Sequence, residues 1–211
     1  MDKRDRKVVL AKSAGFCFGV KRAVEKVNEL ADAGEKVYTL GPIIHNEKVV
    51  AELEKKGVSV VDDLEKATAV KEGYIVIRSH GVDRATDEAL RAVCDASEGR
   101  VKLLDVTCPF VKKIHKIVSK ESLAGKHILI AGDANHPEVR GIVGWSNGPV
   151  NVVDSIQELQ KIDFLSIKEL CLVAQTTFNY KKFEEFVAII EKKGYSRNTS
   201  VVNTICNATE E

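Results

Sequence analysis

Short apolar runs rich in β-branched residues alternate along the chain with longer stretches of helical periodicity. Strands are expected at 8–12, 36–40, 58–62, 74–79, 101–106, 127–132, 150–154, 170–175 and 200–205. Apolar residues recur every three or four positions over 19–34 and 179–194, and each segment ends in a glycine, Gly34 or Gly194, that suits a helix C-cap. Strands and helices that alternate across short connections predict an α/β fold of small parallel sheets.

The pattern repeats along the chain. His45 follows Cys17 by 28 residues, and His136 follows Cys108 by the same 28. Each histidine comes after the second predicted strand of its unit. A third cysteine, Cys206, lies 98 residues after Cys108, which itself lies 91 residues after Cys17. This spacing predicts two complete α/β units, over 1–107 and 108–205, and the start of a third over 206–211.

Three of the five cysteines, Cys17, Cys108 and Cys206, follow predicted strands in equivalent loops. Ligand sites of open parallel sheets form at the carboxyl ends of the strands. Distant thiolates on equivalent loops therefore indicate one shared inorganic centre, which we expect to be iron–sulfur. Zinc is the rival metal, although structural zinc sites usually contain close Cys-x2-4-Cys pairs, which this sequence lacks. Cys94, in a helical stretch, and Cys171, in a strand, are expected to be buried apolar residues.

Loop histidines supply a second kind of chemistry. His45, His80 and His136 stand next to Asn, Gly and Pro, where the backbone can approach a ligand closely. Three imidazoles in one pocket can donate N–H groups to an anion such as a diphosphate. Glu138 lies close enough to His136 to deliver a proton there, although it could equally be a helix N-terminal carboxylate. Thr176, at a strand end, could position a substrate alcohol.

The remaining histidines and the composition narrow the function. His115, on a helix, and His127, at the start of a strand, are expected to be structural or solvated. Lys and Arg number 32 against 31 Asp and Glu, so no overall field attracts nucleic acid or a membrane. No secretory signal follows the charged N-terminus, and no apolar run reaches the roughly 18 residues of a membrane span. We expect a cytoplasmic protein with no nucleic-acid or membrane partner.

The ordered motifs AGFCFGVKRAV, IIHN, RSHGV, DVTCP, NHPEV, QTTF and IC-x-AT closely resemble those of the 4-hydroxy-3-methylbut-2-enyl diphosphate reductase family, the LytB type. The resemblance runs from about Val8 to the C-terminus. It implies three similar α/β domains around a central [4Fe-4S] cluster. The cluster ligands would be Cys17, Cys108 and Cys206, and one iron would have no protein ligand.

The resemblance also implies a reaction and roles. The enzyme would remove the allylic hydroxyl of its diphosphate substrate and give isopentenyl and dimethylallyl diphosphates in the non-mevalonate isoprenoid pathway. His45, His80, His136 and Thr176 would bind the substrate. Glu138, His136 and Thr176 would be catalytic, with Glu138 supplying protons. The electron donor would be a protein such as ferredoxin or flavodoxin.

The end of the sequence departs from this family pattern. Members continue past the third cysteine with further substrate-binding motifs, whereas five residues follow Cys206 here. We therefore expect most of the third unit to be missing. A non-catalytic two-domain remnant that binds anions or a partner, and a thiol-dependent enzyme with one reactive cysteine, are the alternatives.

Overall fold

Two parallel sheets with the same strand order form the protein. The computed structural model describes residues 9, 14–193 and 199–209. The first sheet has the order β2-β1-β3-β4 and the second β6-β5-β7-β8. Their strands are β1 Val37–Leu40, β2 Val58–Val61, β3 Gly73–Ile77, β4 Val101–Asp105, β5 His127–Ala131, β6 Val150–Val153, β7 Leu170–Ala174 and β8 Thr199–Val201. The predicted α/β fold of repeated parallel units is confirmed.

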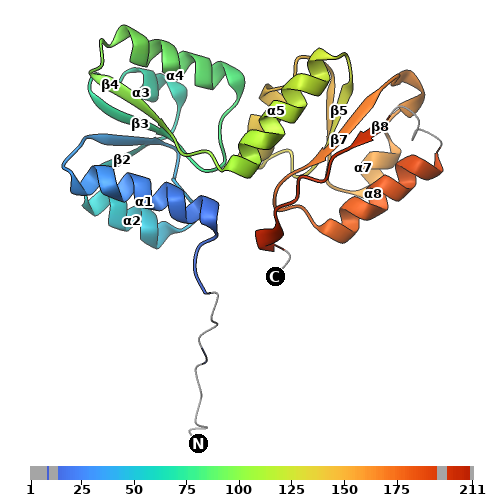
Figure 1. The fold of residues 1–211 in the computed structure, drawn as a ribbon, viewed down its shortest axis with the longest axis horizontal. Coiled ribbons are helices and arrows are strands. Elements are labelled where there is room, and N and C mark those ends of the chain that lie inside the picture. Colours follow the sequence, from blue (N-terminus) through green and yellow to red (C-terminus); the bar gives the residue numbers. More distant parts are fainter. Residues whose placement is uncertain (1–8, 10–13, 194–198, 210–211) are drawn as a thin grey trace, which may run out of the picture.

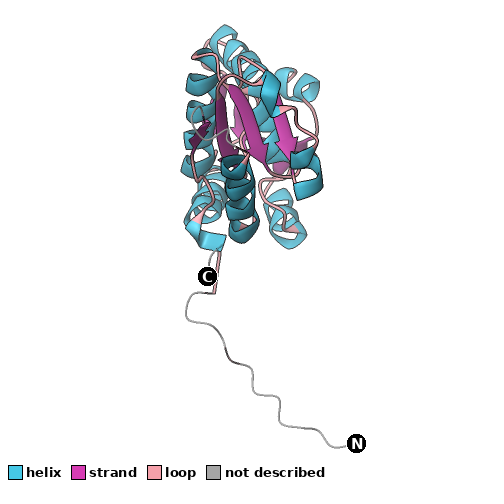
Figure 2. Cartoon of the chain, turned by 90° about the vertical axis from the view of Figure 1, so that its right-hand side faces the viewer, coloured by secondary structure: helices cyan, strands magenta, loops and turns pink. Residues whose placement is uncertain are grey.

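Helices cover both faces of each sheet (Figures 1 and 2). Those of the first half are α1 Phe18–Asp32, α2 Glu47–Lys55, α3 Leu64–Thr68 and α4 Arg84–Ala96. Those of the second half are α5 Pro109–Leu123, α6 Pro137–Gly144, α7 Ile156–Gln160 and α8 Tyr180–Lys192, with short 3-10 turns at Phe164–Ser166 and Asn207–Thr209. In the described ranges, no helix is both long and apolar enough to span a membrane.

The core follows the two-residue period of the strands. In β3, Val76 packs against α1 and α2, whereas Ile75 and Ile77 pack on the opposite face with α3 and α4. In β5, Ile128 and Ile130 face α5 and α6, and the alternate residues of the strand face α7 and α8. Both faces are apolar, as expected of parallel strands covered on each side.

Strand β8 is shorter than the sequence predicts. The expected strand runs over 200–205, but the β ladder ends at Val201. The side chain of Thr204 takes the place of a backbone partner, because its hydroxyl accepts the Ala174 N–H at 2.8 Å and bonds the Ala174 carbonyl. Cys206 consequently lies in a loop beyond this side-chain pairing and does not close the strand directly.

Two other predictions at the chain ends have no test. Most of the predicted strand 8–12, and Gly194, lie outside the described residues. Gly34, at the end of α1, has the positive φ of a C-cap glycine, 76°.

The sheets show which strands pair with each other, but they do not define folding units. The predicted domain boundaries at 107/108 and 205/206 therefore stay predictions.

A polar junction fixes one sheet against the other. Arg84, at the start of α4, donates to Ser119 Oγ and to the Trp145 carbonyl at 2.9 Å and to Asn147 Oδ1 at 2.8 Å. In return, Trp145 Nε1 donates to the Val82 carbonyl at 2.8 Å. Because Val82 closely follows β3 and Trp145 caps the C-terminal end of α6, this junction sets the loop after β3 against the end of α6.

Candidate functional site

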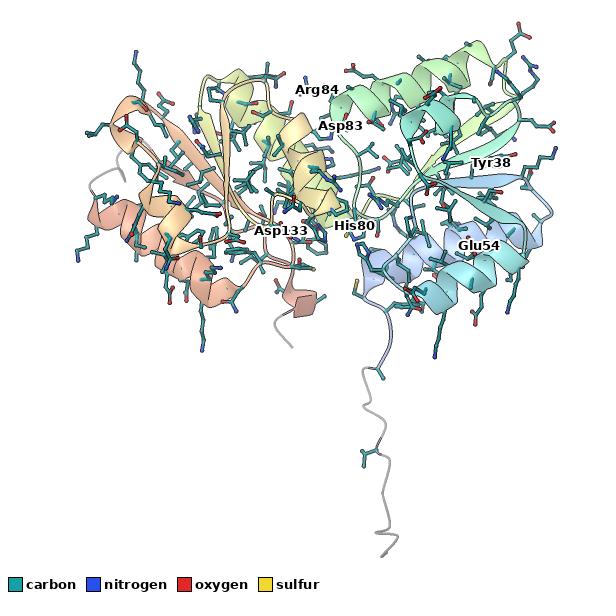
Figure 3. The ribbon with its side chains drawn as sticks, turned by 180° about the vertical axis from the view of Figure 1, so that it is seen from behind. Tyr38, Glu54, His80, Asp83, Arg84 and Asp133 are labelled. Atoms are coloured by element: carbon teal, nitrogen blue, oxygen red, sulfur yellow. The ribbon has the colours of Figure 1, made fainter. Side chains whose placement is uncertain are left out.

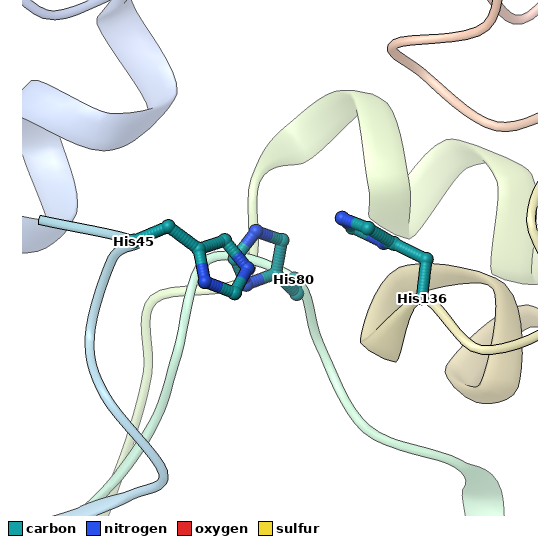
Figure 4. A group of neighbouring side chains, drawn as sticks. All are labelled: His45, His80 and His136. Carbon is teal, nitrogen blue, oxygen red and sulfur yellow. The ribbon is translucent and has the colours of Figure 1, made fainter.

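Three histidines from three strand-end loops meet between the two sheets (Figure 4). Figure 3 marks the position of one of them, His80, between the two halves of the chain. His45 follows β1, His80 follows β3, and His136 follows β5 as the N-cap of α6. The ring centroid of His80 lies 4.8 Å from that of His45 and 5.4 Å from that of His136, and His45 and His136 are 6.0 Å apart. The histidines predicted to converge do so.

The hydrogen bonding of His136 fixes its tautomer. Its Nδ1 accepts the backbone N–H of Glu138 at 3.1 Å, which caps the first turn of α6. The ring proton therefore sits on Nε2. Burial is the main cause that lowers the pKa of His136. The charges of His45, Arg78 and Arg140 lower the pKa further, whereas that of Asp133 raises it. The imidazole is neutral near pH 7 and offers an N–H donor from Nε2.

His80 is also neutral. Burial is the main cause that lowers its pKa, to about 3, and the charges of Arg78, His45 and His136 add to it. Its Nδ1 is buried without a hydrogen-bond partner in the described part of the chain. A proton added there would have no acceptor, which agrees with the neutral form.

Two arginines, Arg78 and Arg140, lie beside the histidines and were missed at the sequence level. Arg78 directly follows β3, and Arg140 is on α6. Among the residues that the structure describes, neither guanidinium has a carboxylate within ion-pair distance. A signal was available, because Arg78 precedes His80 by two residues and Arg140 follows His136 by four, the spacing of one helical face.

Glu138 is buried and bound to Thr176. The Thr176 backbone N–H donates to Glu138 Oε1 at 2.6 Å, and the Thr176 hydroxyl donates to Oε2 at 2.7 Å. The Glu138 residue is only 2% exposed. Burial raises the pKa of Glu138, although the two hydrogen bonds from Thr176 oppose the rise. A buried carboxyl group of raised pKa is suited to deliver a proton.

The cysteine loops converge beside this pair. Cys17 and Cys108 are the N-caps of α1 and α5, and neither thiol makes a capping hydrogen bond. A methyl group at Gly19 would lie 2.7 Å from Cys108 Sγ, so the first turn of α1 touches this thiol. The Cys206 N–H donates to the Thr176 carbonyl at 2.8 Å. Thr176 therefore contacts both the buried carboxyl group and the third cysteine.

The surroundings of the cysteines suit thiolate ligands of an iron–sulfur centre. Burial raises the pKa of Cys108. The nearby backbone N–H groups of Phe110 and Val111 lower it, whereas Cys206 and Cys17 raise it further. A metal replaces the proton on each thiol and removes this mutual repulsion. Backbone N–H groups at helix N-termini stabilise the sulfur ligands of such centres.

The three histidines could in principle hold a metal ion themselves, since their nitrogens all lie within 4.8 Å of one another. Arg78 and Arg140 lie beside them with no ion-pair partner in the described part of the chain, and their charges oppose a cation and favour an anion. The chemistry of this cluster therefore fits a phosphate-type ligand better than zinc.

The other candidate residues lie elsewhere. His115 is only 6% exposed and stacks on Trp145 with centroids 5.3 Å apart, so its structural interpretation was the correct one. His127 begins β5 and pairs with Asn151. Cys171 is fully buried, as expected, whereas Cys94 is only partly so.

Comparison with known proteins gives a consistent result. The family described as LytB protein matches residues 8–211. The 4-hydroxy-3-methylbut-2-enyl diphosphate reductase of Alkaliphilus oremlandii is 44% identical over 208 residues, which cover 97% of this chain and 70% of that protein. The reductase of the same name from Caldanaerobacter subterraneus is 40% identical, with 97% and 68% covered.

Solved structures agree with the sequence matches. A structure titled (E)-4-hydroxy-3-methyl-but-2-enyl diphosphate reductase, the terminal enzyme of the non-mevalonate pathway, has a TM-score of 0.78 and 39% identity and covers 96% of this chain and 69% of its own. The E-1-hydroxy-2-methyl-but-2-enyl-4-diphosphate reductase of Plasmodium falciparum has a TM-score of 0.80 at 29% identity, with 94% and 60% covered. With its fold, its motifs and most of its length matched, this chain belongs to the LytB protein family.

Proposed function

We propose that the chain is an iron–sulfur oxidoreductase that removes the allylic hydroxyl of 4-hydroxy-3-methylbut-2-enyl diphosphate. The reaction consumes two electrons and two protons, releases water, and yields isopentenyl and dimethylallyl diphosphates. The observation that carries this proposal is the position of Thr176, whose N–H and hydroxyl hold Glu138 and whose carbonyl accepts the Cys206 N–H. Thr176 would thereby link the proton donor on α6 to the loop of a metal ligand.

The substrate's diphosphate would lie against the histidine cluster. Nε2–H of His136 is a donor because its Nδ1 is occupied by the Glu138 N–H. His80 and His45 present further ring nitrogens from the adjoining loops. Neutral imidazoles can donate N–H groups to a phosphate at neutral pH and thereby orient it.

Glu138 would act as the proton donor for the departing hydroxyl. Its raised pKa keeps part of the population protonated at a pH where an exposed glutamate is fully ionised. The Thr176 hydroxyl, 2.7 Å from Oε2, can hand a proton from the carboxyl group to the substrate oxygen or hold that oxygen in place. Glu138, His136 and Thr176 are therefore the proposed catalytic residues.

Cys17, Cys108 and Cys206 would hold a [4Fe-4S] cluster. Such a cluster, with one iron free of protein ligands, supplies single electrons and a Lewis acid for the substrate hydroxyl. Since the Cys206 N–H donates to the Thr176 carbonyl, the cluster would lie close to Thr176. Electrons would come from a small redox protein such as ferredoxin or flavodoxin, and the protein would work in the cytoplasm.

Anaerobic reconstitution with iron and sulfide, followed by absorbance and EPR spectroscopy, tests the cofactor. Cys17→Ser, which lacks one proposed ligand, is the control. If wild type and Cys17→Ser are equally folded and the wild type binds no cluster, the reductase proposal is contradicted. With a cluster present, dithionite-driven turnover of the diphosphate substrate separates an enzyme from a non-catalytic remnant that only binds anions.

A further inference from the structure

We propose that Arg78, with Arg140 beside it, is a further substrate-binding residue that supplies the positive charge for the diphosphate. This inference rests on the proposed function, because it concerns the same histidine cluster. It adds to the three histidines a group of a different kind, a permanent cation.

The histidine cluster needs such a group. In His136, Nδ1 already accepts an N–H, and in His80 the buried Nδ1 has no acceptor in the described residues for an added proton. These two imidazoles therefore donate hydrogen bonds without bringing charge. A diphosphate monoester carries at least two negative charges at neutral pH, and its transfer from water into a half-buried pocket is unfavourable unless cations compensate them.

Arg78 is placed for this purpose by its backbone and by Gly41. It directly follows β3, two residues before His80. Gly41, at the end of the neighbouring strand β1, has a φ of 71°, and a methyl group there would lie 2.7 Å from Arg78 Nη1. The guanidinium therefore occupies space that a side chain at position 41 would fill, at the strand ends where His45 and His80 also lie.

The bonding of Arg78 differs from that of other partly buried arginines. Arg22 donates to the Thr107 carbonyl at 2.8 Å, and Arg84 makes three hydrogen bonds across the junction. For Arg78 no side-chain hydrogen bond or ion pair is found among the described residues. Its buried Nε has no partner there, as in Arg22 and Arg84, but unlike them it has no hydrogen bond from its terminal nitrogens either. Burial, and then the like charge of Arg140, lower the pKa of Arg78.

An unpaired, half-buried cation beside a second cation is unfavourable in the free protein. An anion that contacts both guanidinium groups removes the desolvation penalty and the repulsion together. A diphosphate has enough oxygens to do so while it also accepts N–H groups from His80 and His136. A neutral ligand or a metal cation gains nothing from this arrangement.

Inorganic pyrophosphate is the probe, titrated by calorimetry into the cluster-free chain so that turnover is not needed. Arg78→Gln should weaken pyrophosphate binding about tenfold or more, and Arg78→Lys should retain part of the affinity. Arg91→Gln, which removes an exposed arginine paired with Asp87 on α4, should leave binding unchanged. In the loaded enzyme, Arg78→Gln should raise KM much more than it lowers kcat.

Thermal unfolding separates a binding role from a structural one. Without ligand, Arg78→Gln should melt at the wild-type temperature or above it, because an unpaired cation has been removed, and pyrophosphate should stabilise it less. A lower melting temperature without ligand for both Arg78→Gln and Arg78→Lys would overturn the inference. Unchanged pyrophosphate affinity in Arg78→Gln would also overturn it while leaving the reductase proposal intact. A wild type that turns over substrate but binds no pyrophosphate would contradict the inference alone.

Discussion

Both carboxylate oxygens of Glu138 are hydrogen-bonded to Thr176, one to its backbone N–H and the other to its hydroxyl. The two residues come from α6 and from the loop after β7, 38 positions apart in the sequence. The bond joins the first turn of a helix to a strand end of the same sheet. The two bonds fix the orientation of the carboxyl group.

Glu138→Gln should abolish most of the turnover while the site stays intact. A glutamine can accept the Thr176 N–H through its oxygen and donate to the Thr176 hydroxyl through its amide, so the pair remains bonded. It cannot supply a proton, and we expect kcat to fall by about 100-fold or more. Cluster absorbance and pyrophosphate affinity should be those of wild type; activity close to wild type would contradict the role of Glu138 as the acid.

Thr176→Val should move the pH dependence of turnover. The lost hydroxyl stabilises the ionised form of Glu138, so its removal raises the pKa of Glu138 further. The limb of the pH–rate profile that reports this carboxyl group should therefore move to higher pH. Thr176→Ser keeps the hydroxyl and serves as the control, with the limb in its wild-type place. Equal profiles for the two variants would show that the hydroxyl does not control the acid.

Gly19→Ala should impair cluster assembly without unfolding the protein. The added methyl group would meet Cys108 Sγ at 2.7 Å, which forces the thiol or the first turn of α1 to move. We expect less iron bound per chain after reconstitution. Gly141→Ala is the matched helical control, because its methyl group would meet the Val82 backbone at an ordinary 3.5 Å. Equal iron content in both variants would argue against this contact as a constraint on the ligand.

His115 should make the folded state sensitive to acid. Burial is the main cause that lowers its pKa, to about 4. The charges of Asp105 and Asp87 raise the pKa, and the charge of Lys112 lowers it. The unfolded chain takes up a proton near the ordinary value of 6.5, so unfolding is favoured as the pH falls from about 6.5 to about 4. The loss of unfolding free energy is at most about 3 kcal/mol.

Denaturant unfolding of wild type and His115→Gln across this pH range measures the effect. The variant is expected to be less stable at pH 7, because a buried ring stacked on Trp145 is lost. The difference in unfolding free energy between the two proteins should shrink as the pH is lowered. A difference that stays constant between pH 7 and pH 4 would show that His115 does not titrate in this way.

Sequence reasoning found the parts of the site that sit at strand ends. The equal spacing of Cys17 to His45 and Cys108 to His136 follows from two sheets of the same strand order, which a period in the sequence can reveal. The burial of Glu138 and its bond to Thr176 depend on how α6 packs against the end of β7, and no local pattern encodes that contact.

Two features escaped prediction for physical reasons. The sequence does not single out Arg78, because an arginine is normally solvated, and its place against Gly41 and beside the histidines depends on tertiary packing. The end of β8 was placed too late because Val202 and Ile205 extend the apolar run. The Thr204 hydroxyl, which accepts the Ala174 N–H and donates to the Ala174 carbonyl, replaces the ladder there, and hydrophobicity alone does not reveal this.

The junction between the sheets also contains an intrinsic fluorophore. Trp145 is the single tryptophan of the sequence, and its indole is hydrogen-bonded to Val82 and stacked on the His115 ring. All tryptophan emission from this chain thus originates where the two halves meet. A protonated imidazole in that stack would quench the excited indole, and a change in the angle between the sheets would alter its hydrogen bond, so steady-state fluorescence can follow either event without a label.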